Sequence, residues 1–443
     1  MLRKVVATLA FLAAACTAHA ESPPVIGLGD SIGEGVQSAD ANASTQPNTY
    51  LALMAGQMGE PFTLPLIRTS PLGVVGSTTG RSRIDPTARV ANLAVSGASS
   101  GSILTDSAGF PVDEEIDLVE MPRTGTQIEI AQRLRSPLVI CWIGNNDVLG
   151  SALAFDHMDA SQITPQDVFA DNYQQIVDGL TGWNDKVVFA NIPDITRIGF
   201  LFSPDDLKLF IGDSYGLPQG SYTSLVAMLM IRMGLLPPTI LHDPSWVLDA
   251  NEIATIRNAI GGFNRTIATD AAAADMPVVD IHSIMNRLAA HPPMIGGVPL
   301  LPRYNGGLLS LDGVHPSDIG HALIANAFIA KMDATWQMGI PPLSQDQLAS
   351  IALKDPFVDF NGNLIVRGRP LRGLLETLGP ALGISGDRPL QPGIQAELGG
   401  QFMREYFAAT GQNPARAWTQ QDAIAAMRHV FGLDAHAKSG TTH

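Results

Sequence analysis

Two short segments of the chain place a serine between glycines: "GLGDSIGEG" at 27–35 and "FIGDSYGLPQ" at 210–219. Both match G-x-S-x-G, the pattern of a serine presented on a tight turn. A serine hydroxyl becomes a nucleophile only when a base takes its proton, so an oriented histidine must lie nearby in the fold. The segment "SLDGVHPSD" contains Asp312 and His315, three residues apart, and one loop can present both side chains. These residue types favour nucleophilic catalysis.

The negative charge that develops in the transition state of such a reaction must also be stabilised by hydrogen-bond donors. The segment "VANLAVSG" ends at Gly97, whose missing side chain lets its backbone N–H approach a ligand closely. In "GNND", Asn146 offers a side-chain amide, and in other hydrolases such a donor contributes about two to three orders of magnitude in rate. Alone, each residue is more typical of a turn or a loop cap. Their conjunction with Ser31 is informative, because the three residues follow three consecutive predicted strands.

The elements that must position these residues are visible as apolar runs. Five β-rich runs, apolar on both faces, are typical of a buried parallel sheet; they span 24–30, 90–97, 137–147, 186–194 and 276–283. Helical periodicity predicts helices at 126–136, 168–183, 249–275 and 317–336. This alternation predicts a three-layer α/β/α domain with a five-stranded parallel sheet. Ligand chemistry is expected at the carboxyl ends of its strands.

Four blocks of the sequence resemble the SGNH hydrolases, also called the GDSL esterase/lipase family. The matching residues are Ser31 in "GDS", Gly97 in "AVSGAS", Asn146 in "GNND" and His315 in "DGVHP", in the order of the family. The blocks are specific together, although none is specific alone. The resemblance covers roughly residues 24 to 336.

The resemblance implies a role for each of these positions. Ser31 would be the nucleophile, His315 the base and Asp312 the residue that orients it. The backbone N–H groups of Ser31 and Gly97, with the side-chain amide of Asn146, would form the oxyanion hole. No metal or organic cofactor is implied, since these groups supply nucleophile, base and donors.

The position of each serine along the chain decides between the two G-x-S-x-G segments. An α/β-hydrolase elbow needs several strands before its serine, and only about ten residues would precede Ser31 after an N-terminal leader is removed. Ser214 has enough chain before it, but Gly216 and Pro218 follow where the elbow requires a helix. The nucleotide-binding pattern G-x-G-x-x-G does not fit the first segment, because Ile32 occupies the position of its third glycine. Ser31 is therefore the predicted nucleophile.

The first twenty residues, "MLRKVVATLAFLAAACTAHA", have the form of a secretory signal peptide: a basic start, an apolar stretch and a small-residue end. An alternative is a lipoprotein anchored at Cys16. Cleavage after Ala20 would leave Cys141 as the only cysteine, which excludes a disulfide framework. We expect an exported protein, periplasmic or secreted.

The predicted hydrolase domain spans 21–338, with insertions at about 40–88 and 199–248, the first of them irregular. Within the second, "SLVAMLMIRMGLLPP" at 224–238 predicts either a core helix or an acyl-binding lid with membrane-surface contact.

The predicted C-terminal extension, 339–443, has no recognisable chemistry. We expect a hairpin at 355–368 and helices at 394–411 and 419–432, so that the extension is mostly helical.

Five further residues receive structural interpretations. His282 and His321 have no partners at metal-ligand spacing. Asp30 and Asp147 are expected to hold loops beside the catalytic blocks, and Cys141, within a predicted strand, to be a small apolar core residue. No metal site is predicted.

Net charge excludes one class of partner. The formal net charge is -15, and the chain has no Lys/Arg run that could track a phosphate backbone, so no nucleic-acid partner is expected. We expect an esterase or lipase that hydrolyses carboxylic esters through an acyl-enzyme, with a small-molecule or lipid ester as substrate. The alternatives are a carbohydrate O-acetyl esterase and an esterase-like binding protein without activity.

Overall fold

The computed structural model describes residues 22–69, 78, 80–153, 162–232, 237–362, 366 and 411. The predicted signal peptide with Cys16 lies outside these residues. So do the predicted helices at 394–411 and 419–432, apart from residue 411.

The central sheet of the described chain has four parallel strands in the order β1-β4-β5-β9. Their bounds are β1 (Ile26–Gly29), β4 (Val139–Trp142), β5 (Val187–Ala190) and β9 (Val278–Val279). Every residue of β1, β4 and β5 is buried, as expected when helices cover both faces of a parallel sheet. Four of the five predicted runs therefore form strands of this sheet.

The second predicted run, 90–97, is not a strand, so the prediction of five strands is not confirmed. It forms a single parallel bridge, Asn92 with Gly27. Its backbone nevertheless bonds to β1: the Gly27 N–H donates to the Ala91 carbonyl at 3.1 Å, and the Leu93 N–H donates to the Gly27 carbonyl at 2.7 Å. The Val95 N–H still donates to the last residue of β1 at 3.1 Å. The run therefore lies beside β1 and delivers Gly97 to the expected edge of the sheet.

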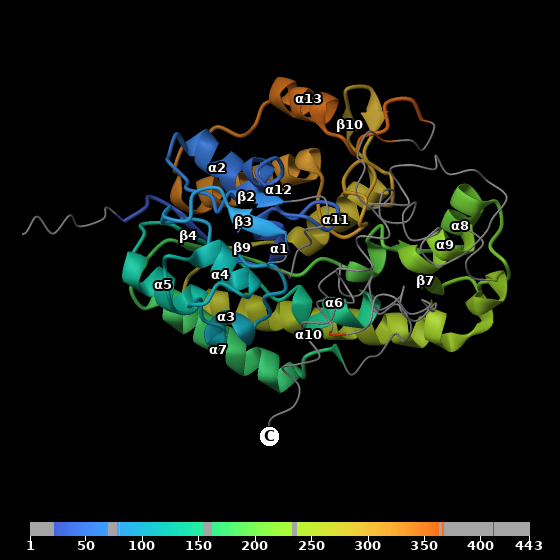
Figure 1. The fold of residues 1–443 in the computed structure, drawn as a ribbon, viewed down its shortest axis with the longest axis horizontal. Helices are drawn as coiled ribbons and strands as arrows, with labels where there is room; N and C mark the ends of the chain where they lie inside the picture. The colour runs from blue at the N-terminus through green and yellow to red at the C-terminus, as the bar shows by residue number, and fades with distance from the viewer. Residues whose placement is uncertain are drawn as a thin grey trace, which may run out of the picture.

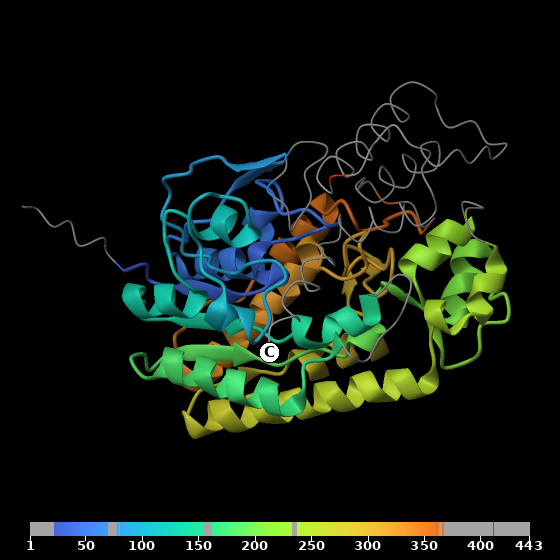
Figure 2. The ribbon, with the colours of Figure 1, turned by 60° about the horizontal axis from the view of Figure 1, so that its bottom comes forward.

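Helices cover both faces of the sheet, which confirms the three-layer α/β/α architecture (Figures 1 and 2). Alternate residues of β4 show the division, because Val139 and Cys141 belong to one core cluster and Ile140 and Trp142 to the other. The first cluster includes α5 (Gln127–Leu134), α7 (Gln166–Thr181) and α10 (Ala250–Ala273). The second includes α2 (Tyr50–Met58) and α12 (Asp318–Trp336). In Figure 2 the green α7 and the yellow-green α10 run along one face.

The expectation that 40–88 is irregular is wrong for part of this segment. Residues 50–58 form α2, which packs against α12. Thr49 caps its first turn by accepting the Ala52 N–H, and Tyr50, Leu51 and Met54 are buried. Helical spacing of apolar residues thus places α2 in the core.

The second insertion, 199–248, forms a small antiparallel sheet with two helices at one end of the molecule (Figure 1). Its elements are β6 (Leu201–Phe202), α8 (Pro204–Ile211), β7 (Tyr222–Ser224), α9 (Leu225–Arg232) and β8 (Val247–Leu248). The apolar segment 224–238 contributes α9, whose Leu225, Ala227 and Met228 are fully buried. Core packing therefore accounts for the apolar character of α9. No helix in the described ranges is both long and apolar enough to cross a membrane.

Residues 339–362, which follow the predicted domain boundary at 338, pack against the hydrolase domain. Helix α13 (Gln345–Lys354) packs against α12, and Leu343, Leu348 and Ala352 belong to the same core cluster as α12. Residues 355–362 contain no strand, and the rest of the predicted hairpin at 355–368 lies outside the described residues, apart from residue 366.

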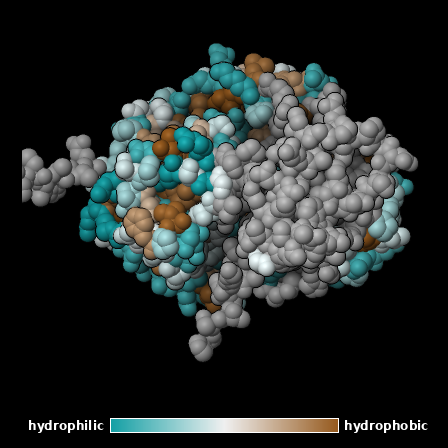
Figure 3. All heavy atoms as spheres, in the orientation of Figure 1, coloured by the Kyte–Doolittle hydropathy of each residue, from teal (hydrophilic) through white to brown (hydrophobic). Residues whose placement is uncertain are grey.

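The shorter elements connect these layers. They are α1 (Ser31–Glu34), β2 (Ile67–Thr69), β3 (Arg81–Arg83), α3 (Ser102–Thr105), α4 (Glu115–Glu120), α6 (Asn146–Leu153), α11 (Ile281–Ala290), β10 (Met294–Ile295), β11 (Val298–Pro299) and 3-10 turns at Gln46–Asn48, Ile195–Arg197, Pro238–His242 and Pro244–Trp246. On the face shown in Figure 3, the coloured surface is mainly hydrophilic, and its apolar patches are small and separate.

Candidate active site

Ser31 lies on a tight turn between β1 and α1, at the carboxyl edge of the sheet. It is the first residue of α1, and the Asp30 side chain caps the helix by accepting the Ile32 N–H at 3.0 Å. Gly29 precedes this turn with φ +150°, and a Cβ there would collide with the carbonyl oxygen of Trp142. The close approach of β1 and β4 therefore requires glycine immediately before the Asp-Ser pair.

The structure brings Ser31, His315 and Asp312 into one hydrogen-bonded series. The Ser31 Oγ atom lies 2.8 Å from His315 Nε2, and His315 Nδ1 lies 2.7 Å from Asp312 Oδ2. The His315 side chain is 15% exposed, whereas that of Asp312 is 2% exposed. The imidazole can therefore take the serine proton at one nitrogen while the buried carboxylate orients the other.

The surroundings of Asp312 keep its carboxylate ionised. Burial alone would raise the pKa of Asp312, but the nearby His315 and several hydrogen bonds outweigh it, and the pKa lies below its ordinary value. Asp312 Oδ1 accepts the backbone N–H groups of Val314 and His315, at 2.8 and 2.9 Å. The Ala39 N–H donates to Oδ2 at 2.9 Å.

Ala39 belongs to a strained turn that the sequence did not single out. Ser38 and Ala39 have φ of 53° and 64°, in the left-handed region that non-glycine residues seldom adopt. Two bonds hold the turn against the Asp312 loop: the Ser38 N–H donates to Ser310 Oγ, and the Leu311 N–H donates to Ser38 Oγ. Nothing in the local sequence signals these contacts, because their partners lie more than 270 positions away.

Gly97 and Asn146 lie on two loops that contact each other. Asn146 begins α6, and its Nδ2 atom donates to the carbonyl of Ala98 at 2.8 Å, which leaves the second amide hydrogen for another acceptor. Gly97 has φ +81°, and the space where a Cβ would stand is open. Within the part of the chain that is described, neither the Gly97 N–H nor the Ser31 N–H donates to any acceptor. These three donors suit an anionic ligand.

Two aspartates fasten the loops, in agreement with the interpretation from sequence. Asp30 accepts a bond from Asn145 Nδ2 at 2.8 Å, and Asp147 accepts the N–H and hydroxyl of Ser100 at 2.8 and 2.6 Å. Burial raises the pKa of Asp30 to about 6.

Gln127, in α5, is a further residue that sequence reasoning missed. Its Oε1 accepts the Gly29 N–H at 2.9 Å and its Nε2 donates to the Gly29 carbonyl at 3.0 Å. The turn that presents Ser31 is thus held from the helix layer, and the sequence around 127 carries no signal of this contact.

The remaining candidates lie apart from the series formed by Ser31, His315 and Asp312. Ser214 follows α8 and its Gly212 cap, in a turn closed by the Leu217 N–H, which donates to the Ser214 carbonyl at 3.0 Å. His242 Nε2 lies 3.1 Å from the neighbouring Tyr215 carbonyl, but within the described residues no bond joins the Ser214 hydroxyl to a histidine. His321 is fully buried, its Nδ1 accepts the Tyr50 N–H at 3.3 Å, and burial lowers its pKa to about 3. His282 contacts the Ile192 carbonyl at 3.2 Å.

Cys141 is fully buried in β4, and burial raises the pKa of its thiol. Among the described residues, no group of three or more His, Cys, Asp or Glu side chains could hold a metal ion.

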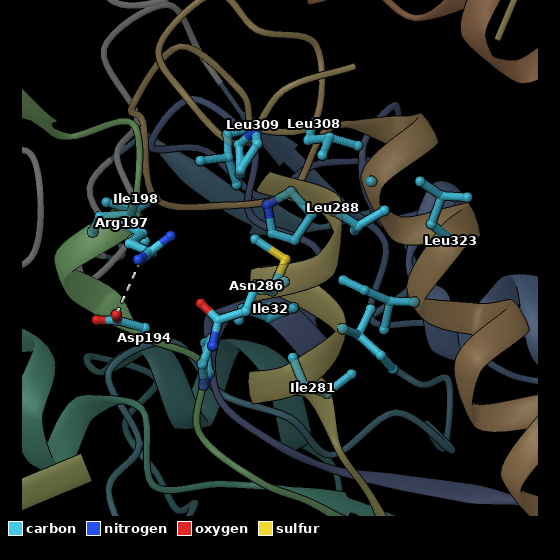
Figure 4. A pocket seen from close by; sticks show the side chains of 18 of the residues that line it. Ile32, Asp194, Arg197, Ile198, Ile281, Asn286, Leu288, Leu308, Leu309 and Leu323 are labelled. Atoms are coloured by element: carbon cyan, nitrogen blue, oxygen red, sulfur yellow. Dashed lines mark ion pairs between the residues drawn. The ribbon is translucent and has the colours of Figure 1, made fainter. Parts of the chain in front are cut away.

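An apolar cavity of about 60 Å³ adjoins the site. Its wall includes Ile32, next to Ser31, and Val314, next to His315. Figure 4 shows aliphatic side chains around it, with an ion pair between Arg197 and Asp194 at one side, 3.4 Å between Nε and Oδ2. The aliphatic side chains of the cavity wall include Leu288 from α11, Leu308 and Leu309 from the loop before α12, and Leu323 from α12.

A protein-family model matches most of the chain. The model of the GDSL-like lipase/acylhydrolase family matches residues 25–328. No curated protein matches the sequence.

Several solved structures are similar to this chain at low identity and low TM-score. A lipase/acylhydrolase from Enterococcus faecalis is 14% identical, with a TM-score of 0.33 over 72% of this chain and 98% of its own. An acetylxylan esterase from Geobacillus stearothermophilus is 15% identical, with a TM-score of 0.36 over 70% and 94%. Phospholipase A1 from Streptomyces albidoflavus is 16% identical, with a TM-score of 0.36 over 70% and 99%. At these similarities the solved structures say nothing about the substrate of this chain.

Proposed function

Since this chain belongs to the GDSL-like lipase/acylhydrolase family and is therefore an ester-bond hydrolase, we propose that it works as a serine esterase through an acyl-enzyme. The observation that supports this most is the hydrogen-bonded series from Ser31 Oγ through His315 to Asp312, at 2.8 and 2.7 Å. Each role in the reaction follows from the position of one group in this series.

In the first half-reaction, Ser31 Oγ attacks the ester carbonyl carbon and its proton passes to His315 Nε2. The carbonyl becomes a tetrahedral oxyanion, while Asp312 stabilises the imidazolium through Nδ1–H. The intermediate collapses, the bond to the alcohol oxygen breaks, and His315 returns the proton to the departing alcohol. Ser31 is left carrying the acyl group as an ester.

In the second half-reaction, water replaces the alcohol. His315 takes one proton of the water, the hydroxide oxygen attacks the acyl carbon, and a second oxyanion forms. Collapse releases the carboxylic acid and returns the proton to Ser31 Oγ. The Ser31 N–H, the Gly97 N–H and the second amide hydrogen of Asn146 are the donors proposed for both oxyanions.

We propose a lipid or other acyl ester as the substrate. The apolar cavity beside Ile32 and Val314 supports this assignment, because aliphatic walls favour an acyl chain and offer little to the hydroxyl groups of a sugar. Helix α9 no longer contributes to the argument, since its described side chains pack in the core. A carbohydrate O-acetyl ester is the less favoured alternative.

We also propose that residues 1–20 direct export, on the basis of their basic start, apolar stretch and small-residue end. The mass of the mature protein tests this: loss of residues 1–20 is expected, whereas a lipid-modified chain beginning at Cys16 would indicate a membrane-anchored lipoprotein.

A serine-directed organophosphonate with a fluorescent tag tests the proposed chemistry. We expect stoichiometric labelling of the folded protein at Ser31, identified by peptide mass, and none after Ser31→Ala. Ser214→Ala is the matched control, because it removes the other G-x-S-x-G serine and should leave labelling unchanged. Absence of a Ser31 adduct in folded protein would instead support the binding protein without activity.

A further inference from the structure

A buried carboxylate holds the residue that precedes Gly97. Glu34 is the last residue of α1, three positions after Ser31, and is fully buried. Its Oε2 atom accepts the Ser96 N–H at 2.7 Å and also the Ser96 hydroxyl. Ser96 is thus attached at two points to the same helix that begins with Ser31.

A buried arginine supplies the counter-charge that such a carboxylate needs. The Arg81 side chain, in β3, is fully buried and lies 3.6 Å from Glu34, between Arg81 Nη2 and Glu34 Oε1. Arg81 also pairs with Glu115 of α4 and donates to the Ala41 carbonyl at 3.2 Å. Burial and the neighbouring Glu115 raise the pKa of Glu34 well above its ordinary value, and Arg81 opposes them, so Arg81 offsets part of the cost of burying this carboxyl group. Through Arg81, the 40–88 segment therefore contributes indirectly to the site.

The opposite side of the same loop is held by packing. Val95 lies in a small apolar cluster with Ala108, Ile116 and Val119, and its carbonyl accepts the Ala98 N–H at 3.1 Å. Gly97 therefore lies in a turn whose preceding residues are fixed on both sides. The Gly97 N–H belongs to the peptide unit that joins it to Ser96, so the direction of this N–H depends on how Ser96 is held.

We propose that Glu34 is a positioning residue for the oxyanion hole: it holds Ser96 so that the Gly97 N–H is directed at the developing oxyanion, with Arg81 as its buried counter-ion. The inference rests on the proposed function, because the Gly97 donor matters only if Ser31 attacks an ester. Glu34 itself touches no substrate atom. Its contribution is to the transition state and not to substrate binding.

Steady-state kinetics of Glu34→Ala, Glu34→Gln and Glu115→Gln on a nitrophenyl ester test the proposal. For Glu34→Ala we expect kcat to fall by about 10- to 100-fold with KM nearly unchanged, somewhat less than for loss of a donor itself. Both Ser96 bonds use a single oxygen of Glu34, and a glutamine amide can supply one, so Glu34→Gln should restore kcat to within about tenfold of the wild type.

Glu115→Gln is the control, since Glu115 pairs with the same arginine and contacts Glu34, whereas the two bonds described for Ser96 both go to Glu34. It should lower the melting temperature without a comparable loss of kcat. Equal losses of kcat in Glu115→Gln and Glu34→Ala would overturn the proposal, as would a Glu34→Ala protein with unchanged kcat. If Glu34→Ala does not fold, Ser96→Ala removes only the hydroxyl bond, and kcat should fall by about 3- to 10-fold.

A measurement that does not depend on activity separates this proposal from the proposed function. Amide hydrogen exchange should show the Ser96 N–H protected in the wild type and at least about tenfold faster to exchange in Glu34→Ala. Protection of Ser96 in a protein that hydrolyses no ester would mean that the proposed function fails while the contact stands. Hydrolysis with an unprotected Ser96 would mean that the positioning role fails alone.

Discussion

Asn145 and Asp30 join two loops of the site directly, through a hydrogen bond of 2.8 Å from Asn145 Nδ2 to Asp30 Oδ2. Asp30 immediately precedes Ser31, and Asn145 immediately precedes Asn146. The proposed nucleophile and one proposed oxyanion donor are therefore held by a contact between their chain neighbours. Both side chains are almost fully buried, which fixes the spacing of the two loops.

Asp30→Asn tests the energetic consequence of this burial. The pKa of Asp30 is raised from 3.8 to about 6, so the folded protein keeps a proton that the unfolded chain loses between these values. The contribution of Asp30 to stability is thus complete below pH 3.8 and is lost as pH rises through about 6. Urea unfolding should show the wild type losing about 2 kcal/mol relative to Asp30→Asn between pH 4 and pH 7. A constant difference across this range would contradict the assignment.

For His321→Asn, the difference in unfolding free energy from the wild type should change with pH in the opposite direction. Burial lowers the pKa of His321 from 6.5 to about 3, so the unfolded chain binds a proton that the folded protein does not. Its contribution is present above pH 6.5 and is lost as pH falls toward 3. Between pH 7 and pH 4, the wild type should lose about 3 kcal/mol of unfolding free energy relative to His321→Asn. Because Asp30 and His321 act in the same range with opposite signs, the pH dependence of the two variants should differ from that of the wild type in opposite directions.

Asn146→Ala tests the proposed amide donor. We expect kcat for a nitrophenyl ester to fall by about 100- to 1,000-fold with little change in KM, as expected for a group that acts on the transition state. Asn145→Ala is the contrast, because that amide binds Asp30 and is buried away from substrate. It should lower the melting temperature and reduce kcat by less than about tenfold. Similar losses of kcat in the two variants would argue against a donor role for Asn146.

The sequence predicted the elements that carry the site because each has a local signal. Residues 137–147 and 186–194 read as buried strands from their apolar runs, and 317–336 reads as a helix from its Ser317 cap. Ser31 and Asn146 follow such strands directly. Their approximate place in the fold could therefore be inferred without any knowledge of contacts.

The contacts that hold the site were not predictable in the same way. Glu34 with Ser96, Asp312 with Ala39 and Gln127 with Gly29 join positions 62 to 273 residues apart, and no short pattern encodes them. Ser, Thr, Pro and Gly are frequent in the 40–88 segment around α2, and this composition led to the expectation of an irregular insertion. The predicted fifth strand is not confirmed, although the backbone of 90–97 bonds to β1 through Ala91, Leu93 and Val95.

The apolar cavity beside Ile32 and Val314 leads to a prediction about substrate length. In a series of nitrophenyl esters from acetate to dodecanoate, we expect kcat/KM to rise from acetate toward octanoate. Each methylene of the acyl chain that contacts the apolar wall of the cavity should strengthen binding of the transition state. Ile284, on α11, lines the cavity and is partly exposed. Ile284→Phe should fill part of the space and lower kcat/KM for octanoate by about tenfold while acetate changes by less than about threefold.

Leu209→Phe is the matched control for this series, since Leu209 on α8 is 45% exposed and does not line the cavity. It makes the same kind of enlargement at the surface and should leave the whole chain-length profile unchanged. An equal loss for acetate and octanoate in Ile284→Phe would mean that the substitution disturbs the site generally and that the acyl chain lies elsewhere. Acetate turned over far faster than octanoate by the wild type would instead favour the carbohydrate O-acetyl ester, because a cavity used for an acyl chain cannot penalise the chain that fills it.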